Sequence, residues 1–400
     1  MFKNPLHEEF GSWALGFAPY GGADVGEVAA IAAAVGDGDD NAFYDTWRAA
    51  ADRLAGEGKD AEAAGHPASA RESYLHAACF YAVAYHPIYG TPVDQRLVDC
   101  FHAQTSAFDT AMQLSDPPVE SVSIPYEHTT MPGYLLRARG REHETRPLLI
   151  GTNGYDATAT EMYFAFGLAA AERGYHCLLF DGPGQGKLLI EDGVPIRADW
   201  EHVVTPVVDL ALGLDGVDHD RIALTGWSLG GYLALRAASG EHRLAACIAD
   251  PGTDGIWEGM STMAKLAGLS DEVAAKLPDA DDATLRTLMT GIEAEPHARW
   301  GILQRGFWVN GADNLGDWLK AVRPFTLEGR YGDIRCPTLL TSAENDVLGK
   351  GAPAMLDKLT CPKALLEFTA AEGAGDHCEI MNRTLLNRRV FDWLDGVLTA

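Results

Sequence analysis

Residues 222–238 read IALTGWSLGGYLALRAA. A short apolar run, typical of a buried strand, breaks at Gly226-Trp227-Ser228-Leu229-Gly230 and resumes as a helix rich in Ala and Leu. A serine on such a strand-to-helix turn, with a glycine two residues away on either side, is a nucleophile elbow. The pattern therefore predicts an exposed hydroxyl on Ser228. The backbone amide of Leu229, at the positive end of the new helix, is expected to face the oxyanion that forms when Ser228 attacks a carbonyl.

A histidine base is the next requirement, because a serine hydroxyl is a weak nucleophile at neutral pH. Three histidines follow Ser228 along the chain: His242, His297 and His377. His377 is the predicted base, since it lies in a loop of small residues between a strand-like run and the last helix. His242 is too close to the elbow helix, and His297 is expected on a helix surface.

The histidine needs a carboxylate to fix its tautomer, and in this arrangement the acid lies between the serine and the histidine in the chain. Residues 336–341 predict a buried strand, and the stretch 342–346 follows at its carboxyl end, where catalytic groups gather in open α/β sheets. Asp346 is the predicted acid. Glu344 is the alternative, and its other role would be a hydrogen bond that shapes the loop. Asp376 is expected to brace the histidine loop.

A second oxyanion donor is expected from the loop 151–156, Gly-Thr-Asn-Gly-Tyr-Asp, which follows an apolar strand. Its glycines let the backbone approach a substrate oxygen closely, so the amide of Tyr155 is the predicted partner of the Leu229 amide. Another glycine motif, LLFDGPGQG at 178–186, lacks both the ending of a phosphate-binding P-loop and GxGxxG spacing. It is interpreted as the next strand and its turn.

Six segments together carry a family resemblance: GTNGYDATATEMYF (151–164), FDGPGQG (180–186), DWEHVVTPVVDLAL (199–212), GWSLGGYLALRAA (226–238), IRCPTLLTSAENDVL (334–348) and AEGAGDHCE (371–379). They resemble the α/β-hydrolase group that includes 2,6-dihydroxypseudooxynicotine hydrolase, fungal hydrolases that shorten heptaketide pigment precursors, and fermentation/respiration switch esterase-like proteins. Residues 68–78 and 124–135 resemble the helical front domain and entry strand specific to this group. The resemblance implies a Ser-Asp-His hydrolase acting on acyl groups, with carbon–carbon cleavage of aryl or β-diketones among its chemistries, and homodimerisation through the front domain.

The expected architecture is α/β, with the α/β-hydrolase fold: a mostly parallel, doubly wound sheet, an N-terminal helical domain and a helical cap insertion. Residues 1–120 are predicted to form the N-terminal helical domain. Alternating strands and helices at 121–250 predict the first part of the core. Residues 251–332 are expected to form the cap above the nucleophile, and 333–400 the second part of the core.

Substrate contacts are expected from residues near the elbow and in the cap: Gly154, Trp227, Asp254, Glu258 and Trp308. Aromatic residues are frequent in the insertion, where indoles could form a flat apolar acyl pocket, although structural packing is the alternative role for each. Asp254 and Glu258 are candidates to bind a substrate hydroxyl or ammonium, or else are solvated loop carboxylates. Arg305 is a candidate partner for an anionic group.

The composition, with 31 basic and 57 acidic residues and a net charge of −26, disfavours nucleic acid and anionic membrane surfaces as partners. Seven scattered cysteines without a CxxC pair predict reduced thiols, and no metal or cofactor is expected. The amino terminus has no basic start followed by an apolar stretch, and no run approaches 18 apolar residues, so a cytoplasmic protein is expected.

The predicted function is that of a serine hydrolase cleaving an acyl bond, either a carbon–carbon bond of an aryl or β-diketone or an ester, in a small aromatic or polyketide-like metabolite. A carboxylesterase or an acyltransferase would use the same three residues. A non-catalytic small-molecule binding protein on a hydrolase scaffold is the alternative of another class. A prolyl-oligopeptidase-type peptidase is disfavoured, because 120 helical residues leave no room for its β-propeller.

Overall fold

One eight-stranded sheet organises the chain, whose computed structural model describes residues 1–257, 270–274 and 276–398. The strand order is β1-β2-β4-β3-β5-β6-β7-β8. The strands are β1 (Glu120–Tyr126), β2 (Thr129–Leu136), β3 (Arg146–Thr152), β4 (His176–Phe180), β5 (Val217–Trp227), β6 (Ala246–Asp250), β7 (Thr338–Ala343) and β8 (Lys363–Phe368). Strand β2 pairs antiparallel with both of its neighbours, β1 and β4. All the other neighbouring pairs in the sheet are parallel.

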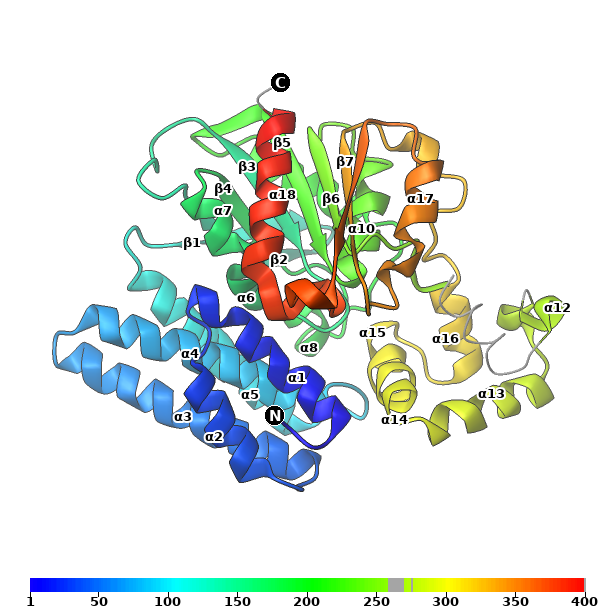
Figure 1. Ribbon diagram of the computed structural model, residues 1–400, viewed down its shortest axis with the longest axis horizontal. Coiled ribbons are helices and arrows are strands. Elements are labelled where there is room, and N and C mark those ends of the chain that lie inside the picture. Colours follow the sequence, from blue (N-terminus) through cyan, green and yellow to red (C-terminus); the bar gives the residue numbers. More distant parts are fainter. Residues whose placement is uncertain (258–269, 275, 399–400) are drawn as a thin grey trace.

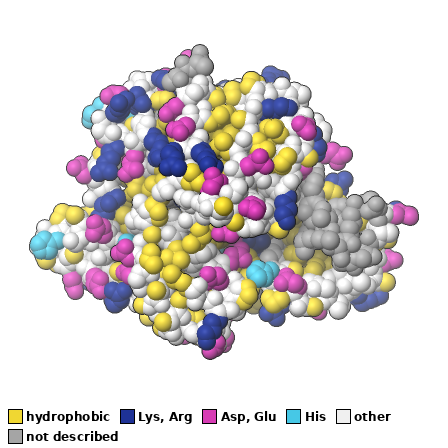
Figure 2. Space-filling view, in the orientation of Figure 1, with side chains coloured by type: hydrophobic (Ala, Val, Ile, Leu, Met, Phe, Trp, Pro, Cys, Tyr) yellow, Lys and Arg dark blue, Asp and Glu magenta, His cyan; other side chains and the backbone are white. Residues whose placement is uncertain are grey.

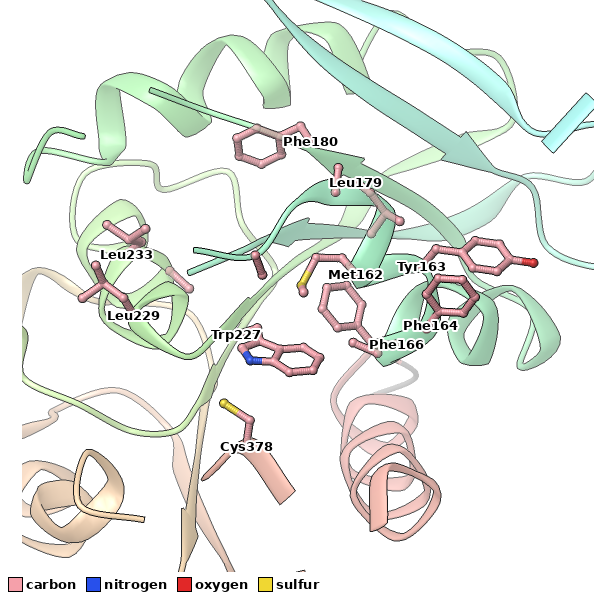
Figure 3. Close-up of a cluster of buried hydrophobic side chains, with 14 of the residues drawn as sticks. Met162, Tyr163, Phe164, Phe166, Leu179, Phe180, Trp227, Leu229, Leu233 and Cys378 are labelled. Atoms are coloured by element: carbon pink, nitrogen blue, oxygen red, sulfur yellow. The ribbon is translucent and has the colours of Figure 1, made fainter. Parts of the chain in front are cut away.

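The central strands are mostly buried, as expected for parallel strands covered on both faces, although β5 has exposed residues in its first half. Every residue of β4 and of β6 is buried. The flanking helices include α7 (Leu168–Glu172), α9 (Glu201–Ala211), α10 (Leu229–Ala238), α17 (Ala352–Lys358) and α18 (Arg383–Leu398). Figure 3 shows part of the core between them, with Phe166, Leu179 and Trp227 among its members. The predicted mostly parallel α/β architecture is confirmed.

The first part of the chain is helical, with α1 (Pro5–Phe17), α2 (Val25–Val35), α3 (Asp40–Ala63), α4 (Pro67–Tyr85) and α5 (Gln95–Gln113). Side chains cap three of these helices at their first turns, where backbone amides lack partners within the helix: Asn4, Asp39 and Asp94. Large aromatic side chains, among them Phe43 and Trp47, are fully buried between the helices. This region therefore has an apolar core of its own that is continuous with the core around the sheet.

A helical insertion separates β6 from β7. Its described elements include α12 (Asp271–Ala274), α13 (Asp282–Ala294), α14 (Pro296–Ala298), η5 (Arg299–Gly306), α15 (Phe307–Val309) and α16 (Leu315–Val322). Figure 1 shows the insertion and the N-terminal helices along the same side of the sheet. They contact one another directly: Trp300 Nε1 donates to the carbonyl of His86 over 3.0 Å, and Thr91 N donates to the carbonyl of Gln304 over 3.1 Å.

The last helix begins later than the sequence predicts. A helix from about Ile380 is expected, but α18 begins at Arg383 and is preceded by short turns over His377–Asn382. Cys378 and Glu379 adopt positive φ angles of 53° and 49°, which interrupt a right-handed helix.

Acidic and basic side chains are interspersed on the face shown in Figure 2. All seven cysteines are free thiols. No helix in the described part of the chain is long and apolar enough to cross a membrane.

Candidate active site

Ser228 lies in a strained turn between β5 and α10, with φ 59° and ψ −125°. This conformation is costly for a residue with a side chain and persists only where the surroundings hold it. The neighbouring glycines explain how strand and helix come so close: a Cβ on Gly226 would lie 1.8 Å from the carbonyl oxygen of Gly230. The amide of Ser228 donates to the carbonyl of Asp250 over 2.6 Å, which ties the turn to the end of β6.

A chain of hydrogen bonds joins Ser228, His377 and Asp346. The distance from Ser228 Oγ to His377 Nε2 is 2.8 Å, and that from His377 Nδ1 to Asp346 Oδ2 is also 2.8 Å. The second oxygen of Asp346 accepts from the amide of Leu348 over 2.9 Å. Asp346 therefore accepts the Nδ1 proton, and the free lone pair on Nε2 faces the serine hydroxyl. This is the tautomer that can accept a proton from Ser228.

The pair Asp346–His377 is electrostatically matched. Burial by itself would raise the pKa of Asp346, but the charge and hydrogen bond of His377 bring that pKa below its ordinary value. Burial by itself would lower the pKa of His377, but Asp346 brings it above the ordinary value for histidine. An ionised Asp346 would therefore stabilise a protonated imidazole at His377.

The competing residues lie elsewhere. Glu344 accepts a hydrogen bond from the amide of Ala370 over 2.8 Å, so its carboxylate shapes the loop. His297 is about half exposed and lies 3.5 Å from Glu9 of α1. His242 contacts the backbone carbonyls of Ser239 and Asp333.

The loop after β3 lies directly on the elbow. A Cβ on Gly154 would lie 2.9 Å from Ser228 Cβ and 3.2 Å from the Leu229 amide nitrogen. Gln185 Nε2 donates to the carbonyls of Asn153 and Gly154, both over 2.9 Å. In a trans peptide the carbonyl and the following N–H point in opposite directions. Holding the Gly154 carbonyl toward Gln185 therefore aims the Tyr155 amide away from Gln185.

Gln185 and Asp181 support this loop, and neither was predicted from the sequence to have a role at the site. Asp181 Oδ1 accepts from Asn153 Nδ2 over 2.5 Å and from the amide of Ala159 over 2.8 Å. Its complete burial raises its pKa to about 7. The available signal was the motif FDGPGQG, whose polar members stand at the end of an otherwise apolar strand. The hydrogen bonds that hold Asn153 and Gly154 thus come from residues about 30 positions away in the chain.

Comparison with known proteins identifies the family. A model described as "Alpha/beta hydrolase family" matches residues 148–384, more than half of the chain. The chain belongs to this family. Its curated relatives include "Hydrolase LUC6" from Fusarium sp, 31% identical over 396 residues and covering 95% of this chain and 94% of the relative. Another is "20-hydroxy-prefusarin hydrolase FUS2" from Gibberella moniliformis, 31% identical over 397 residues, with 96% and 94% covered.

Among solved structures, the 2,6-dihydroxy-pseudo-oxynicotine hydrolase shares the fold, with a TM-score of 0.74 at 23% identity over 96% of this chain and 95% of that one. The match spans both the sheet and the N-terminal helices. The chain is therefore a hydrolase, and the fold that it shares with this structure extends over almost its whole length.

Aromatic contacts extend from the loop after β3 of this alpha/beta hydrolase into the helical insertion. The Arg305 guanidinium lies 4.7 Å from the ring centre of Tyr155 and 4.6 Å from that of Trp300, and it pairs with Asp156 over 2.6 Å. The Trp308 ring lies 5.0 Å from that of Tyr89 in the N-terminal region. The core, the insertion and the N-terminal region thus each contribute aromatic groups to these contacts.

The substrate-contact predictions meet different outcomes. Gly154 lies at the elbow as described above. The Trp227 ring packs in the core, against Phe17 and under Arg383, and is only 3% exposed, so it supports the elbow from within (Figure 3). Asp254 is held by Tyr331 and Lys358. Trp308 is half-buried beside Tyr89, and Glu258 lies outside the described residues.

Proposed function

We propose that this hydrolase is a serine hydrolase in which Ser228, His377 and Asp346 cleave an acyl bond of a small aromatic or polyketide-like metabolite. The observation that carries the proposal is the continuous hydrogen-bond chain between the three side chains, with two contacts of 2.8 Å, at a strained elbow. Nucleophile, base and orienting acid come from three separate loops at the carboxyl ends of β5, β7 and β8.

In the first half of the reaction, Ser228 Oγ attacks the carbonyl carbon while His377 Nε2 takes the hydroxyl proton. The amides of Leu229 and Tyr155 stabilise the resulting oxyanion, supported by Gln185 behind the loop. The bond to the leaving group then breaks, and His377 gives its proton to the departing atom. In an ester that atom is oxygen, whereas in a diketone it is carbon, whose negative charge the second carbonyl delocalises.

In the second half, water attacks the acyl-enzyme. His377 takes a proton from the water, and the acid product leaves as Ser228 recovers its hydrogen. The same base thus acts twice, which requires His377 to be neutral at the start of each half.

Two observations support an aromatic or polyketide-like substrate. Aromatic side chains gather in this part of the molecule: Tyr155 of the loop after β3 and Trp300 of the insertion lie on either side of Arg305, and Trp308 packs against Tyr89. The curated relative from Gibberella moniliformis acts, by its name, on 20-hydroxy-prefusarin.

The decisive experiment compares wild type and Ser228→Ala on a paired set of aryl esters and aryl 1,3-diketones, with products followed by mass. Diketone cleavage that is lost in the variant supports a carbon–carbon hydrolase. Ester turnover alone supports a carboxylesterase, and transfer of the acyl group to an added alcohol or amine supports an acyltransferase. Activity that survives in Ser228→Ala contradicts the proposed mechanism.

A fluorophosphonate probe tests the alternative of a non-catalytic binding protein. Such probes phosphonylate a serine only when a neighbouring base activates it. We expect labelling at Ser228 in the wild type and none in Ser228→Ala. Folded wild-type protein that stays unlabelled favours the binding protein.

A further inference from the structure

A second cluster of ionisable side chains lies behind the nucleophile elbow, and the proposed reaction does not use it. It consists of Asp250 at the end of β6, Arg383 at the start of α18 and Glu379 in the turn after His377. The three residues are buried, with 4%, 1% and 0% of their surface exposed. Charged groups so deeply buried are rare unless they are paired.

Arg383 forms hydrogen bonds with three separate segments near the candidate site. Its Nη1 donates to Asp250 Oδ2 over 2.8 Å and to the carbonyl of Cys378 over 2.6 Å. Its Nε and Nη2 donate to the carbonyl of Ala165 over 3.3 and 3.2 Å. The guanidinium carbon also lies 4.6 Å from the ring centre of Trp227. One side chain thus contacts the residue before Ser228 and the residue after His377, and Figure 3 places Trp227 and Cys378 together in the core.

The turn held by Arg383 is strained. Cys378 and Glu379 both adopt positive φ angles although neither is glycine, and they directly follow the base. Such a conformation persists only where tertiary contacts hold it. The hydrogen bond from Arg383 to the Cys378 carbonyl is one such contact. On the other side of the cluster, the Asp250 carbonyl accepts the amide of Ser228 over 2.6 Å. The same group of residues therefore holds both the nucleophile and the base.

The hydrogen bonds assign the charges within the cluster. Asp250 accepts from Thr341 Oγ1 over 3.0 Å and from Arg383, so it is the ionised carboxylate. Glu379 faces Asp250, yet neither of its oxygens has a donor among the described residues. Two buried carboxylates beside one guanidinium would leave a negative charge uncompensated. A proton on one Glu379 oxygen, donated to Asp250, gives that oxygen a partner and makes the cluster neutral.

The electrostatic surroundings agree with this assignment. Burial, together with the charge of Asp250, raises the pKa of Glu379 well above its ordinary value, against the opposing effect of Arg383. The charged groups that face Glu379 are Asp250 from β6, Arg383 from α18 and Asp346 from the loop after β7. Two of these three are acidic.

We propose that Arg383, Asp250 and Glu379 form a positioning unit for the catalytic residues, in which the two carboxyl groups share one proton and Arg383 holds the turn that carries His377. The inference rests on the proposed function, because positioning matters only if Ser228 and His377 perform the reaction.

The first test replaces Arg383 by lysine, which keeps the charge but cannot donate to Asp250, Cys378 and Ala165 together. The matched control is Arg388→Lys, at an exposed position of the same helix. We expect Arg383→Lys to lower kcat on an aryl ester by about tenfold or more with KM nearly unchanged, since misplaced groups slow the chemical step. The control should stay within about twofold of wild type. A folded Arg383→Lys enzyme that behaves like the control overturns the positioning role.

The second test replaces Glu379 by glutamine, which is neutral, nearly the same size and able to donate to Asp250. The infrared difference spectrum between wild type and Glu379→Gln at pH 7 should contain the carbonyl stretch of a protonated carboxyl group from the wild type. Carboxylate bands in place of that stretch overturn the shared proton.

Fluorophosphonate labelling separates this inference from the proposed function. Labelling of wild type but not of Ser228→Ala upholds the proposed function. In that case the Arg383 and Glu379 variants test only whether the positioning unit exists. Wild type that stays unlabelled contradicts the proposed function and the positioning role with it, whereas the infrared spectrum still decides whether Glu379 and Asp250 share a proton.

Discussion

At the scale of single residues, the orientation of one peptide depends on Gln185. This side chain accepts from the amide of Gly182 over 2.9 Å and donates to the carbonyls of Asn153 and Gly154. It is buried, so lost hydrogen bonds are not replaced by bulk water. The direction of the Tyr155 amide, the proposed oxyanion donor, therefore follows from a buried side chain of another loop.

Replacing Gln185 by alanine should release this loop. We expect kcat on an aryl ester to fall by about 10- to 100-fold, less than the loss of a direct oxyanion donor, with a smaller change in KM. Gln95→Ala, at an exposed position of α5, serves as the control and should leave kcat unchanged. Steady-state kinetics measure the effect. An unchanged kcat in folded Gln185→Ala would show that the loop after β3 keeps its conformation without Gln185.

The pH dependence of the reaction should report His377. Its pKa lies above the ordinary histidine value, and the base must be neutral, so activity is low below this pKa and increases as the pH rises through it. We expect the acid limb of kcat/KM to have its midpoint above about 6.5, the ordinary histidine value. A profile that is flat from pH 5 to 8 would exclude His377 as the base.

Asp346→Asn removes the charge that raises the pKa of His377 and leaves a similar shape. By analogy with other serine hydrolases, kcat should fall by about 10⁴-fold, because the imidazole is no longer held in the correct tautomer. Glu344→Gln is the control, since its carboxylate only accepts from the backbone of Ala370. Equal losses in both variants, measured by initial rates, would mean that the acid is wrongly assigned.

At the scale of elements, α1 packs directly against the turn that carries the base. A Cβ on Gly16 would lie 2.2 Å from the carbonyl oxygen of Ile380. Figure 1 shows α1 beside the start of α18, although the two are more than 350 residues apart in the sequence. The first helix of the chain thus supports the loop that carries His377.

Gly16→Ala should therefore be destabilising, by about 1–3 kcal/mol, since backbone atoms must shift to admit the methyl group. Gly56→Ala in α3 is the matched control: its Cβ would meet no atom within 4 Å, and alanine there should stabilise by up to about 1 kcal/mol. Urea unfolding measures both free energies. Opposite signs are expected, and a neutral Gly16→Ala would mean that α1 can move away at little cost.

At the scale of the whole molecule, the net charge of −26 should make stability depend on salt. Self-repulsion opposes the compact state, and salt screens it. We expect the Tm to rise between low ionic strength and 0.15 M NaCl, where the Debye length is about 8 Å. Sucrose at equal osmolality separates screening from solvent exclusion. A Tm that falls with NaCl would show that attractive ion pairs, such as Arg236–Glu201, outweigh the repulsion.

The sequence by itself determined the family, the order of strands and helices, and the identity of the residues that lie at the elbow. These features are local: a GxSxG turn between a strand and a helix, an acid after one strand and a histidine after the next can each be recognised within about fifteen residues. The end of β5 and the start of α10 could be located for the same reason, because an unbroken apolar run on each side of the elbow is visible within a few residues of sequence.

Only the tertiary structure decided what holds these residues in place. Gln185 reaches the loop after β3, Arg383 joins Asp250 to Cys378, and α1 packs on the turn after His377. The Trp227 ring packs inward because it contacts Phe17 and Arg383, which are also distant in the chain. Each contact pairs groups distant in the chain, and no pattern in either segment encodes its partner. The left-handed turn at Cys378 and Glu379 exists because these distant contacts outweigh the local preference for a helix.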